Sequence, residues 1–364
     1  MMAAKRVFFA LQISGVLLAF NVLASPIKTD ESVQFFPSIG IRNRDGSCDL
    51  EIRGWVFEKE WRPGVTTLFG KYIGVDSSTL TPIERARFSE RTRLFLVDAE
   101  KGKKCSIEFQ GRSYTLPASD ATGHFQGRLR LEAGTALGLS SSDSGVQPVS
   151  FRAILPRGDE RSFTGSVMLM PPSGISVISD VDDTIRASEV GERQALLVNT
   201  FVKPLRPVPG MAEFYQSLSR KAGASFHYVS ASPSQLYPVL SEFVQSNAFP
   251  AGSFHLRPLQ WKKGFFQPGS AAVREFKEGQ VEALLRNFPE RRWILVGDSG
   301  ELDPEIYGKL ARRYPDHVGK IIIRATPGAP PSDSGRYSAA FRGLPAGVWQ
   351  VFTNASEIEF PRLR

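Results

Sequence analysis

Apolar and polar residues alternate with a period of two along about residues 45–170 of the chain. Successive side chains of a half-buried β-strand point to opposite faces of a sheet, so this period is typical of strands. We therefore predict an antiparallel β-sandwich or barrel with little helix, in which we find no cluster of catalytic residue types. The strand segments are DLEIRGWVFE, RLFLVDA, CSIEFQG, HFQGRLRLE, VSFRAIL and FTGSVMLM.

From about residue 174 the pattern changes to strands that alternate with helices. ISVISD, SFHYVSAS, RWILVGD and KIIIRA are typical of buried strands, and GMAEFYQSLSRKA and FKEGQVEALLRNF have helical spacing of apolar residues. A further helix is expected in SPSQLYPVLSEFVQSN, with Ser232 as its cap and Pro233 in its first turn. This alternation predicts a parallel sheet with helices on both faces. We place the β-rich domain at residues 25–172 and the α/β domain at residues 173–364.

The N-terminus has the pattern of a secretory signal peptide. Lys5 and Arg6 precede the apolar run VFFALQISGVLLAFNVLAS, in which Val22 and Ala24 match the small-residue pattern of a cleavage site. We interpret residues 1–24 as a signal peptide and the protein as exported, periplasmic or secreted, and possibly peripheral on a membrane. An uncleaved membrane anchor is the alternative, because the run is nearly long enough to span a bilayer.

The net charge, the cysteines and the histidines indicate which partners, cross-links and metals to expect. The formal net charge of +8 over 364 residues favours polyanionic partners such as phospholipid head groups or phosphorylated substrates. The basic residues are scattered and lack interleaved aromatics, so we expect no nucleic-acid binding. Cys48 and Cys105 would form a disulfide in an oxidising compartment, with two buried free thiols as the alternative. The four histidines have no ligand spacing, so a zinc site is not expected.

Three of the predicted strands in the α/β domain end in polar residues. The first ends in DVDDT, which contains Asp180 and Asp182, the second in Ser230, and the third in GDSGELD, which contains Asp298 and Asp303. The carboxyl ends of neighbouring parallel strands meet at one edge of a sheet, where α/β proteins hold their ligands. Carboxylate oxygens without histidine or thiol favour Mg²⁺, and a bound cation would offset the charge of the acids.

These motifs resemble those of a known superfamily. The D-x-D-x-T spacing in DVDDT is similar to the first motif of haloacid dehalogenase-like phosphotransferases. The four motifs would be carried, in order, by Asp180, Asp182 and Thr184, by Ser230, by Lys277, and by Asp298 and Asp303. SDVDDTI, NTF, VPGMAEFY, FHYVSASP, QLYPVL and LVGDSGELDPEIY more closely resemble the phosphatidate phosphatase catalytic domain of the actin-patch-protein type, from about Ile175 to Arg324. The resemblance implies a haloacid dehalogenase-like Rossmannoid domain that follows the β-sandwich-like domain in the chain.

The resemblance also implies a Mg²⁺-dependent phosphatase that acts through an aspartyl-phosphate. Asp180 would be the nucleophile, and Asp182 the general acid and base whose backbone carbonyl also binds the metal. Thr184 would brace the loop that holds both acids. Ser230 would donate a hydrogen bond to the phosphoryl group, and Lys277 would neutralise its charge.

The remaining acids would bind the metal. Asp180 and Asp298 would be direct ligands of Mg²⁺, with Asp303 supporting them. Alternatives stay open for single residues: Lys262 or Lys263 in place of Lys277, and a plain helix-cap role for Asp303. We interpret Asp183 as a cap or a solvated acid. GDSG also surrounds the nucleophile of trypsin-like proteases, but the βαβ context and the absence of a suitable histidine motif argue against that mechanism.

The substrate implied is phosphatidate, held at an anionic membrane surface. The segment between Ile185 and Pro207 is too short for a large cap domain and could form a small flap, which leaves the site open to a membrane lipid. Two alternatives remain: an exported phosphatase for a soluble or other phosphate ester, and a non-enzymatic surface-binding protein that uses its β domain.

Overall fold

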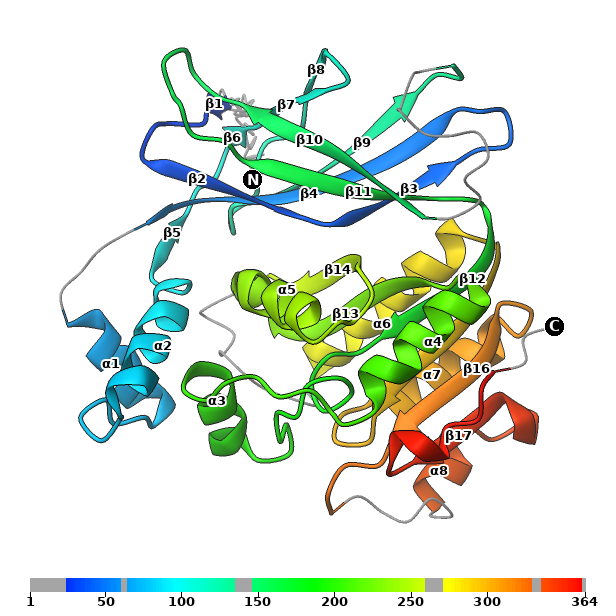
Figure 1. Cartoon of the computed structure of the whole chain (residues 1–364). Helices are drawn as coiled ribbons and strands as arrows, with labels where there is room; N and C mark the ends of the chain where they lie inside the picture. Colours follow the sequence, from blue (N-terminus) through cyan, green and yellow to red (C-terminus); the bar gives the residue numbers. More distant parts are fainter. Residues whose placement is uncertain (1–23, 60–63, 135–145, 259–270, 329–334, 362–364) are drawn as a thin grey trace, which may run out of the picture.

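The computed structural model describes residues 24–59, 64–134, 146–258, 271–328 and 335–361, which form two sheets that lie one above the other in Figure 1. The predicted signal segment lies outside the described residues, apart from Ala24. Within the described ranges, no helix has the length and apolar character needed to cross a membrane.

The first sheet is rich in antiparallel pairs. Neighbouring strands are antiparallel throughout except for β3 and β11, which run parallel. Its order is β2 (Glu31–Phe36), β4 (Cys48–Lys59), β3 (Ser38–Arg42), β11 (Thr164–Met170), β10 (Gln147–Ile154), β7 (Ser106–Phe109) and β8 (Arg112–Thr115), with β5 (Val97–Ala99) and β9 (His124–Leu131) also paired to β4. Two short strands, β1 (Ser25–Pro26) and β6 (Lys103–Lys104), pair separately. The predicted β-rich, sandwich-like domain is confirmed.

A helical hairpin interrupts this domain, and here the prediction of little helix is wrong. It consists of α1 (Val65–Ile73) and α2 (Pro82–Arg93), inserted between β4 and β5. The segment RLFLVDA was predicted as a strand, but only its last three residues form β5. Its first residue, Arg93, ends α2, and residues 94–96 form the turn between α2 and β5. The hairpin buries Phe69 and Phe88 in the apolar cluster of the α/β domain rather than in the β-sheet core.

The second sheet is parallel throughout, as predicted. Its order is β14 (Gly252–Arg257), β13 (Ser225–Pro233), β12 (Ser173–Ser179), β15 (Glu290–Asp298), β16 (Val318–Arg324) and β17 (Trp349–Phe352). The helices are α3 (Arg193–Phe201), α4 (Met211–Ala222), α5 (Tyr237–Ser246), α6 (Ala271–Asn287), α7 (Asp303–Arg313) and α8 (Gly335–Ala340), with 3₁₀ turns at Ser234–Leu236, Ala346–Val348 and Ala355–Glu357. The expected α/β architecture is therefore confirmed.

Consecutive residues of the central strand pack into opposite layers. Val177 lies in a cluster with residues of α3, α4 and α5, whereas Ile178 lies in a cluster with residues of α6, α7 and α8. Val177 and Ile178 are therefore both apolar although they are consecutive, because both faces of a covered parallel sheet are buried. Figure 1 shows the helices around this sheet.

The strand order reverses at β12. The chain passes from β12 outward to β13 and β14 on one side, then returns to β15 and continues to β16 and β17 on the other. The crevice at the carboxyl end of such a switch point is where open α/β sheets bind ligands. The DVDDT segment begins directly after β12, at this position.

The two domains are joined by specific polar contacts. The backbone N–H of Phe254 donates to the carbonyl of Pro37 at 3.0 Å, and Arg53 Nη2 donates to the carbonyl of Phe254 at 2.8 Å. His124 Nε2 lies 2.9 Å from Ser234 Oγ. Strand β14 is thus attached to the β-rich sheet along the edge of the parallel sheet.

The expected disulfide is absent, and that expectation is wrong for this structure. Cys48 and Cys105 are both free and buried in the core of the β-rich domain. Cys48 begins β4 and Cys105 lies directly before β7, and these strands are not neighbours in the sheet. Burial raises the pKa of the Cys105 thiol to about 12, which keeps it protonated and unreactive.

Candidate active site

A tight loop follows β12 and turns the acids of DVDDT into the switch-point crevice. The Asp180 N–H donates to the carbonyl of Val296 at 2.9 Å, which extends the pairing of β12 with β15 by one residue. The N–H groups of Ile185 and Arg186 then both donate to the carbonyl of Val181 at 3.0 Å, closing the loop. Asp180 therefore lies at a strand end that backbone hydrogen bonds fix in place.

Asp183 stabilises this loop from within. Its backbone has a positive φ of 55°, which costs energy for a non-glycine residue. Its carboxylate accepts backbone hydrogen bonds from Ser188, Glu189 and Val190 at 2.8, 2.9 and 2.6 Å. The side chain is buried, so the interpretation as a solvated acid is wrong, and its N–H partners lie in the loop before α3, so it caps a loop and not a helix. Arg324 Nη1 donates to the Asp183 carbonyl at 2.6 Å, so this arginine reaches the catalytic loop.

Lys277 lies at the centre of the acidic cluster. Its Nζ is 2.8 Å from Oδ1 of Asp180 and 2.9 Å from Oδ1 of Asp303. It also contacts Oε2 of Glu301 at 2.5 Å. The lysine comes from α6, and the three acids come from the ends of β12 and β15 and the start of α7. Among the lysines considered, Lys277 is therefore the one placed beside Asp180; Lys262 and Lys263 lie outside the described residues.

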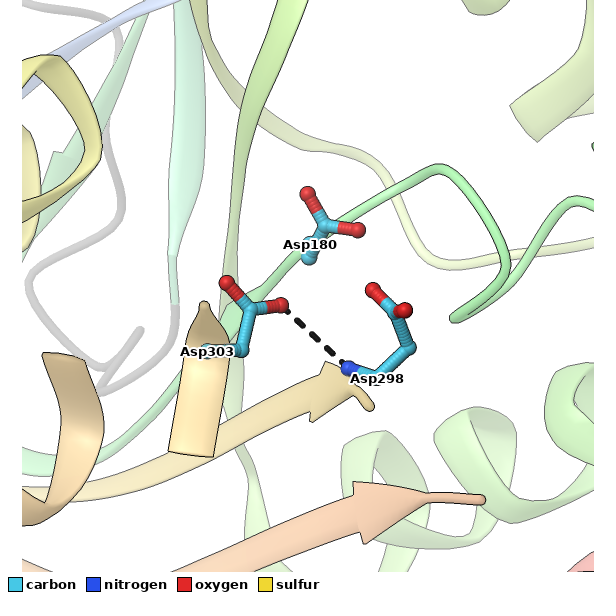
Figure 2. A group of neighbouring side chains, drawn as sticks. All are labelled: Asp180, Asp298 and Asp303. Carbon is cyan, nitrogen blue, oxygen red and sulfur yellow. Dashed lines mark hydrogen bonds between the residues drawn. The ribbon is translucent and has the colours of Figure 1, made fainter. Parts of the chain in front are cut away.

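Asp180, Asp298 and Asp303 form a group suited to a metal ion. Each offers a carboxylate oxygen within 4.8 Å of the others, and Figure 2 shows the three side chains at the ends of their elements. The Asp298 N–H donates to Oδ2 of Asp303 at 3.2 Å, which fixes the two acids relative to each other. Asp303 is thus more than a helix cap, since both of its oxygens are bound inside the cluster.

The donor set fits a hard cation on its own chemistry. Asp298 Oδ1 accepts hydrogen bonds from Gly300 and Glu301, but Oδ2 is buried without a hydrogen-bond partner. A buried carboxylate oxygen without a partner is costly unless a cation compensates it. Three carboxylates, those of Asp180, Glu301 and Asp303, contact the ammonium of Lys277, and the carboxylate of Asp298 lies in the same group. A divalent ion coordinated by oxygen atoms would therefore relieve the excess negative charge.

Burial and mutual repulsion shift the pKa values of this cluster. Burial, followed by the charge of neighbouring acids, raises the pKa of Asp298 well above its usual range. Burial likewise raises the pKa of Asp180, with Lys277 opposing the shift. For Lys277, burial alone would lower the pKa, but the surrounding carboxylates outweigh it and the pKa is raised. The lysine is therefore permanently cationic, and the acids favour either protons or a metal.

Asp182 lies in a different environment from Asp180. Arg186 Nε donates to Oδ1 of Asp182 at 2.9 Å, and Arg186 Nη2 forms a second contact with the same oxygen. Ser232 Oγ donates to Oδ2 at 2.7 Å. Burial raises the pKa of Asp182, but Arg186 and Ser232 outweigh burial and the net pKa is lowered. Its carboxylate lies outside the metal-binding group, and the predicted metal contact through its backbone carbonyl stays a prediction.

Thr184 lies beside Asp180, and Ser230 lies beside Asp182. Thr184 Oγ1 donates to Oδ2 of Asp180 at 3.3 Å, which is consistent with a bracing position. Ser230 Oγ is 3.5 Å from Oδ2 of Asp182 and accepts a hydrogen bond from the Ser232 N–H at 3.0 Å. All the site residues predicted from the sequence therefore gather at one edge of the sheet.

Three further residues of this site were not predicted. Ser232 was expected to cap a helix, but it lies in β13 and the helix α5 begins only at Tyr237, so that expectation is wrong. Its hydroxyl is instead bound to Asp182. Glu301 belongs to GDSGELD, so it could have been predicted as a site residue together with Asp298 and Asp303 of the same motif. Arg186 had only a weak signal, an arginine four residues after Asp182 in the same loop.

The fold and the site define a class of protein. A parallel sheet with an acid pair after β12, a serine near the carboxyl end of β13, a lysine on α6 and acids at and after the end of β15 fits the haloacid dehalogenase-like superfamily. The sequence profile described as "Phosphatidate phosphatase APP1, catalytic domain" matches residues 175–325. Residues 175–325, which are less than half of the chain, are thus similar to the catalytic domain of that family, as their motifs indicated.

Two curated relatives each match nearly half of the chain. Phosphatidate phosphatase APP1 of Saccharomyces cerevisiae is 34% identical over 169 residues, which is 46% of this chain and 28% of that protein. An uncharacterized protein of Schizosaccharomyces pombe is 30% identical over 169 residues, 45% of this chain and 27% of that protein. The chain thus spans little more than a quarter of the length of these relatives. The profile match at residues 175–325 does not include the β-rich domain.

Proposed function

We propose that the α/β domain is a Mg²⁺-dependent phosphoric monoester hydrolase that acts through an aspartyl-phosphate on Asp180. The observation that carries the proposal is the contact of Asp180 with Lys277, next to Asp298 and Asp303, at the switch point of the parallel sheet. The match of residues 175–325 to the phosphatidate phosphatase catalytic domain supports phosphatidate as the substrate and diacylglycerol and phosphate as the products.

In the first step, a carboxylate oxygen of Asp180 attacks the phosphorus atom. The bond from phosphorus to the glycerol oxygen breaks as the new bond forms, and Asp182 donates a proton to the leaving oxygen. Lys277 stabilises the negative charge on the phosphoryl oxygens. The ammonium is held by Asp303 and Glu301, so it is already oriented before substrate binds.

In the second step, water attacks the phosphorus atom of the aspartyl-phosphate. Asp182 accepts the proton of that water, inorganic phosphate leaves and the Asp180 carboxylate is restored. Arg186 and Ser232 favour the carboxylate form of Asp182, which is the form needed here. For the first step, a bound phosphoryl dianion would raise the pKa of Asp182 through repulsion and so allow it to carry a proton.

The metal would be held by Asp180, Asp298 and Asp303, with the backbone carbonyl of Asp182 as a further ligand. Mg²⁺ at this position would supply positive charge that draws a phosphoryl oxygen and the Asp180 carboxylate together. The buried, unpartnered Oδ2 of Asp298 supports this assignment.

Phosphate release tests the function directly. Phosphatidate in mixed micelles and a panel of soluble phosphate esters are assayed with and without Mg²⁺, using the wild type, Asp180→Asn and the exposed control Asp316→Asn. We expect Mg²⁺-dependent release from phosphatidate that Asp180→Asn abolishes and Asp316→Asn leaves intact. Release from soluble esters only would retain the mechanism and reject the lipid. Release from none of them would favour the binding-protein alternative.

We infer from the basic and apolar N-terminal segment that the protein is exported. N-terminal sequencing of the protein recovered from its producing cells tests this, and we expect the mature chain to begin at Ser25. A mature chain that begins at residue 1 or 2 and stays with the soluble cytoplasmic fraction would contradict it.

A further inference from the structure

Exposed apolar side chains concentrate on the helical hairpin α1–α2. In the part of the chain that the structure describes, five large hydrophobic side chains are strongly exposed, and three of them belong to this hairpin. They are Leu68 at 66%, Tyr72 at 55% and Ile83 at 71%. Leu68 and Tyr72 are four residues apart on α1, so they share one face of that helix.

The hairpin is fixed to the catalytic domain close to the active site. Figure 1 shows it extending from the β-rich sheet to lie beside α3, the helix that follows the catalytic loop. Arg91 Nη1 donates to the carbonyls of Thr200 and Lys203, both at 2.8 Å, and Gln194 Nε2 donates to the carbonyl of Gly74 at 2.9 Å.

Thr200 also connects the hairpin to Asp182, the proposed general acid. Arg186 Nη2 donates to Thr200 Oγ1 at 3.2 Å, and Arg186 is the ion-pair partner of Asp182. Since Arg91 binds the backbone of the same Thr200, a single residue links the hairpin to the arginine that holds Asp182. A surface on the hairpin therefore has a fixed position relative to the active site.

Charge on the hairpin complements an anionic surface. Lys71 and Arg85 are exposed and lie next to the apolar residues along the chain. The acids Asp76 and Glu84 are bound in caps, to Ser78 and Thr81 respectively. Aliphatic and aromatic side chains flanked by basic ones are the pattern of segments that insert shallowly among lipid head groups.

We propose that the exposed surface of α1–α2, formed by Leu68, Tyr72 and Ile83 with Lys71 and Arg85, docks the protein on an anionic lipid bilayer. This inference rests on the proposed function for its substrate, since phosphatidate is an anionic lipid within a bilayer. A stable protein partner needs about 800 Å² of contact on each side, whereas shallow insertion needs only a few exposed apolar side chains.

Vesicle flotation with matched serine variants tests the docking surface. Vesicles of phosphatidylcholine, with or without phosphatidylglycerol, contain no substrate, so binding is measured apart from catalysis. Ile83→Ser is compared with Ile154→Ser, which changes the same residue type at an exposed position on β10, away from the hairpin. We expect Ile83→Ser to lower the partition coefficient on anionic vesicles about tenfold, and Ile154→Ser to leave it unchanged.

Activity on two forms of phosphatidate completes the test. On short-chain phosphatidate below its critical micelle concentration, Ile83→Ser should match the wild type, whereas on long-chain phosphatidate in vesicles it should require about tenfold more lipid for half-maximal rate. Equal partition of the two serine variants, or no vesicle binding by the wild type, would overturn the docking surface. Vesicle binding without hydrolysis of any phosphate ester would instead reject the proposed function and leave the docking surface standing.

Discussion

The ammonium of Lys277 lies 2.8 Å from Oδ1 of Asp180, and both side chains are buried. The pair joins α6 to the end of β12 across the crevice where the strand order reverses. Removing two charged groups from water costs free energy. The attraction between the two groups and their contacts with neighbouring side chains offset this cost only while all of these side chains are present. The contact therefore links catalysis to the integrity of the cluster.

Removing this lysine should abolish most of the activity. We expect Lys277→Met to lower kcat by at least about a hundredfold, the range seen when one preorganised charge or hydrogen-bond donor is lost. The measurement is steady-state phosphate release at saturating Mg²⁺. Lys309→Met is the matched control, because Lys309 is 51% exposed and pairs with Glu278 on the surface. An active Lys277→Met enzyme would contradict the role assigned to the lysine.

Arg186 should act by positioning Asp182. We expect Arg186→Met to lower kcat more than tenfold with little change in KM, because the general acid loses its orientation while substrate contacts remain. Arg186→Lys keeps a cation in the same place and should recover part of kcat. If both variants lose activity equally and both also melt at much lower temperature than the wild type, the arginine serves the fold and not the acid.

Gly297 should be required for the placement of Asp303. A Cβ at this position would lie 2.4 Å from Oδ2 of Asp303, so Gly297→Ala must displace that carboxylate from Asp298. We expect the Mg²⁺ concentration for half-maximal activity to rise at least about tenfold, which is 1.4 kcal/mol in binding free energy. Gly279→Ala is the control, because its Cβ meets nothing within 4 Å and the residue lies inside α6.

That control has its own expected result. Alanine in place of a helical glycine should raise the free energy of unfolding by about 0.4–1 kcal/mol and leave the Mg²⁺ dependence unchanged. Urea unfolding measures the stability, and a Mg²⁺ titration of activity measures the dependence. Equal Mg²⁺ curves for the two alanine variants would mean that the position of Asp303 does not govern metal binding.

Acid should weaken the contact between the two domains through His255. This residue is hydrogen-bonded to Ser253 and Gln280, at 2.9 and 3.1 Å, and lies 3.3 Å from Arg53 of the β-rich domain. Burial, followed by the charge of Arg53, lowers its pKa well below the usual value of 6.5. The unfolded chain therefore binds a proton that the folded chain does not, so stability is present above pH 6.5 and declines as the pH falls below it.

A glutamine variant isolates this histidine from the other titrating groups. His255→Gln should be less stable than the wild type at pH 7.5, and the gap should narrow by at most about 1.4 kcal/mol for each pH unit below the pKa of a free histidine. Urea unfolding at several pH values measures the gap. A gap that stays constant or widens on acidification would show that His255 is not held neutral in the folded state.

The residues at strand ends could be predicted from the sequence because their position follows from chain pattern alone. Asp180, Ser230 and Asp298 each stand at the carboxyl end of a mostly apolar segment, and the topology of a parallel sheet brings such positions together. Lys277 could be placed only through the motif order. The distance between Lys277 and Asp180 depends on how α6 packs against the sheet, and the local sequence pattern does not predict that packing.

The hairpin and the environment of Asp182 could not be predicted in this way. In α2 most residues are polar and Phe88 is the one buried large apolar side chain, so the helix gives little apolar periodicity. The capping box formed by Thr81 and Glu84 was the available signal. Ser232 follows the cap pattern before a proline, yet the strand continues past it, because its hydroxyl is bound to an acid fifty residues earlier in the chain.

The aspartyl-phosphate on Asp180 is the central claim, and trapping it is the most direct test. Phosphatidate labelled with ³²P in its phosphate group is mixed with the enzyme and Mg²⁺, the reaction is quenched in acid within milliseconds, and the labelled peptide is mapped. We expect label on the peptide that contains Asp180, absent without Mg²⁺ and absent in Asp180→Asn. Phosphate release by the wild type with no labelled protein at any quench time, or with label on another residue, would contradict the mechanism.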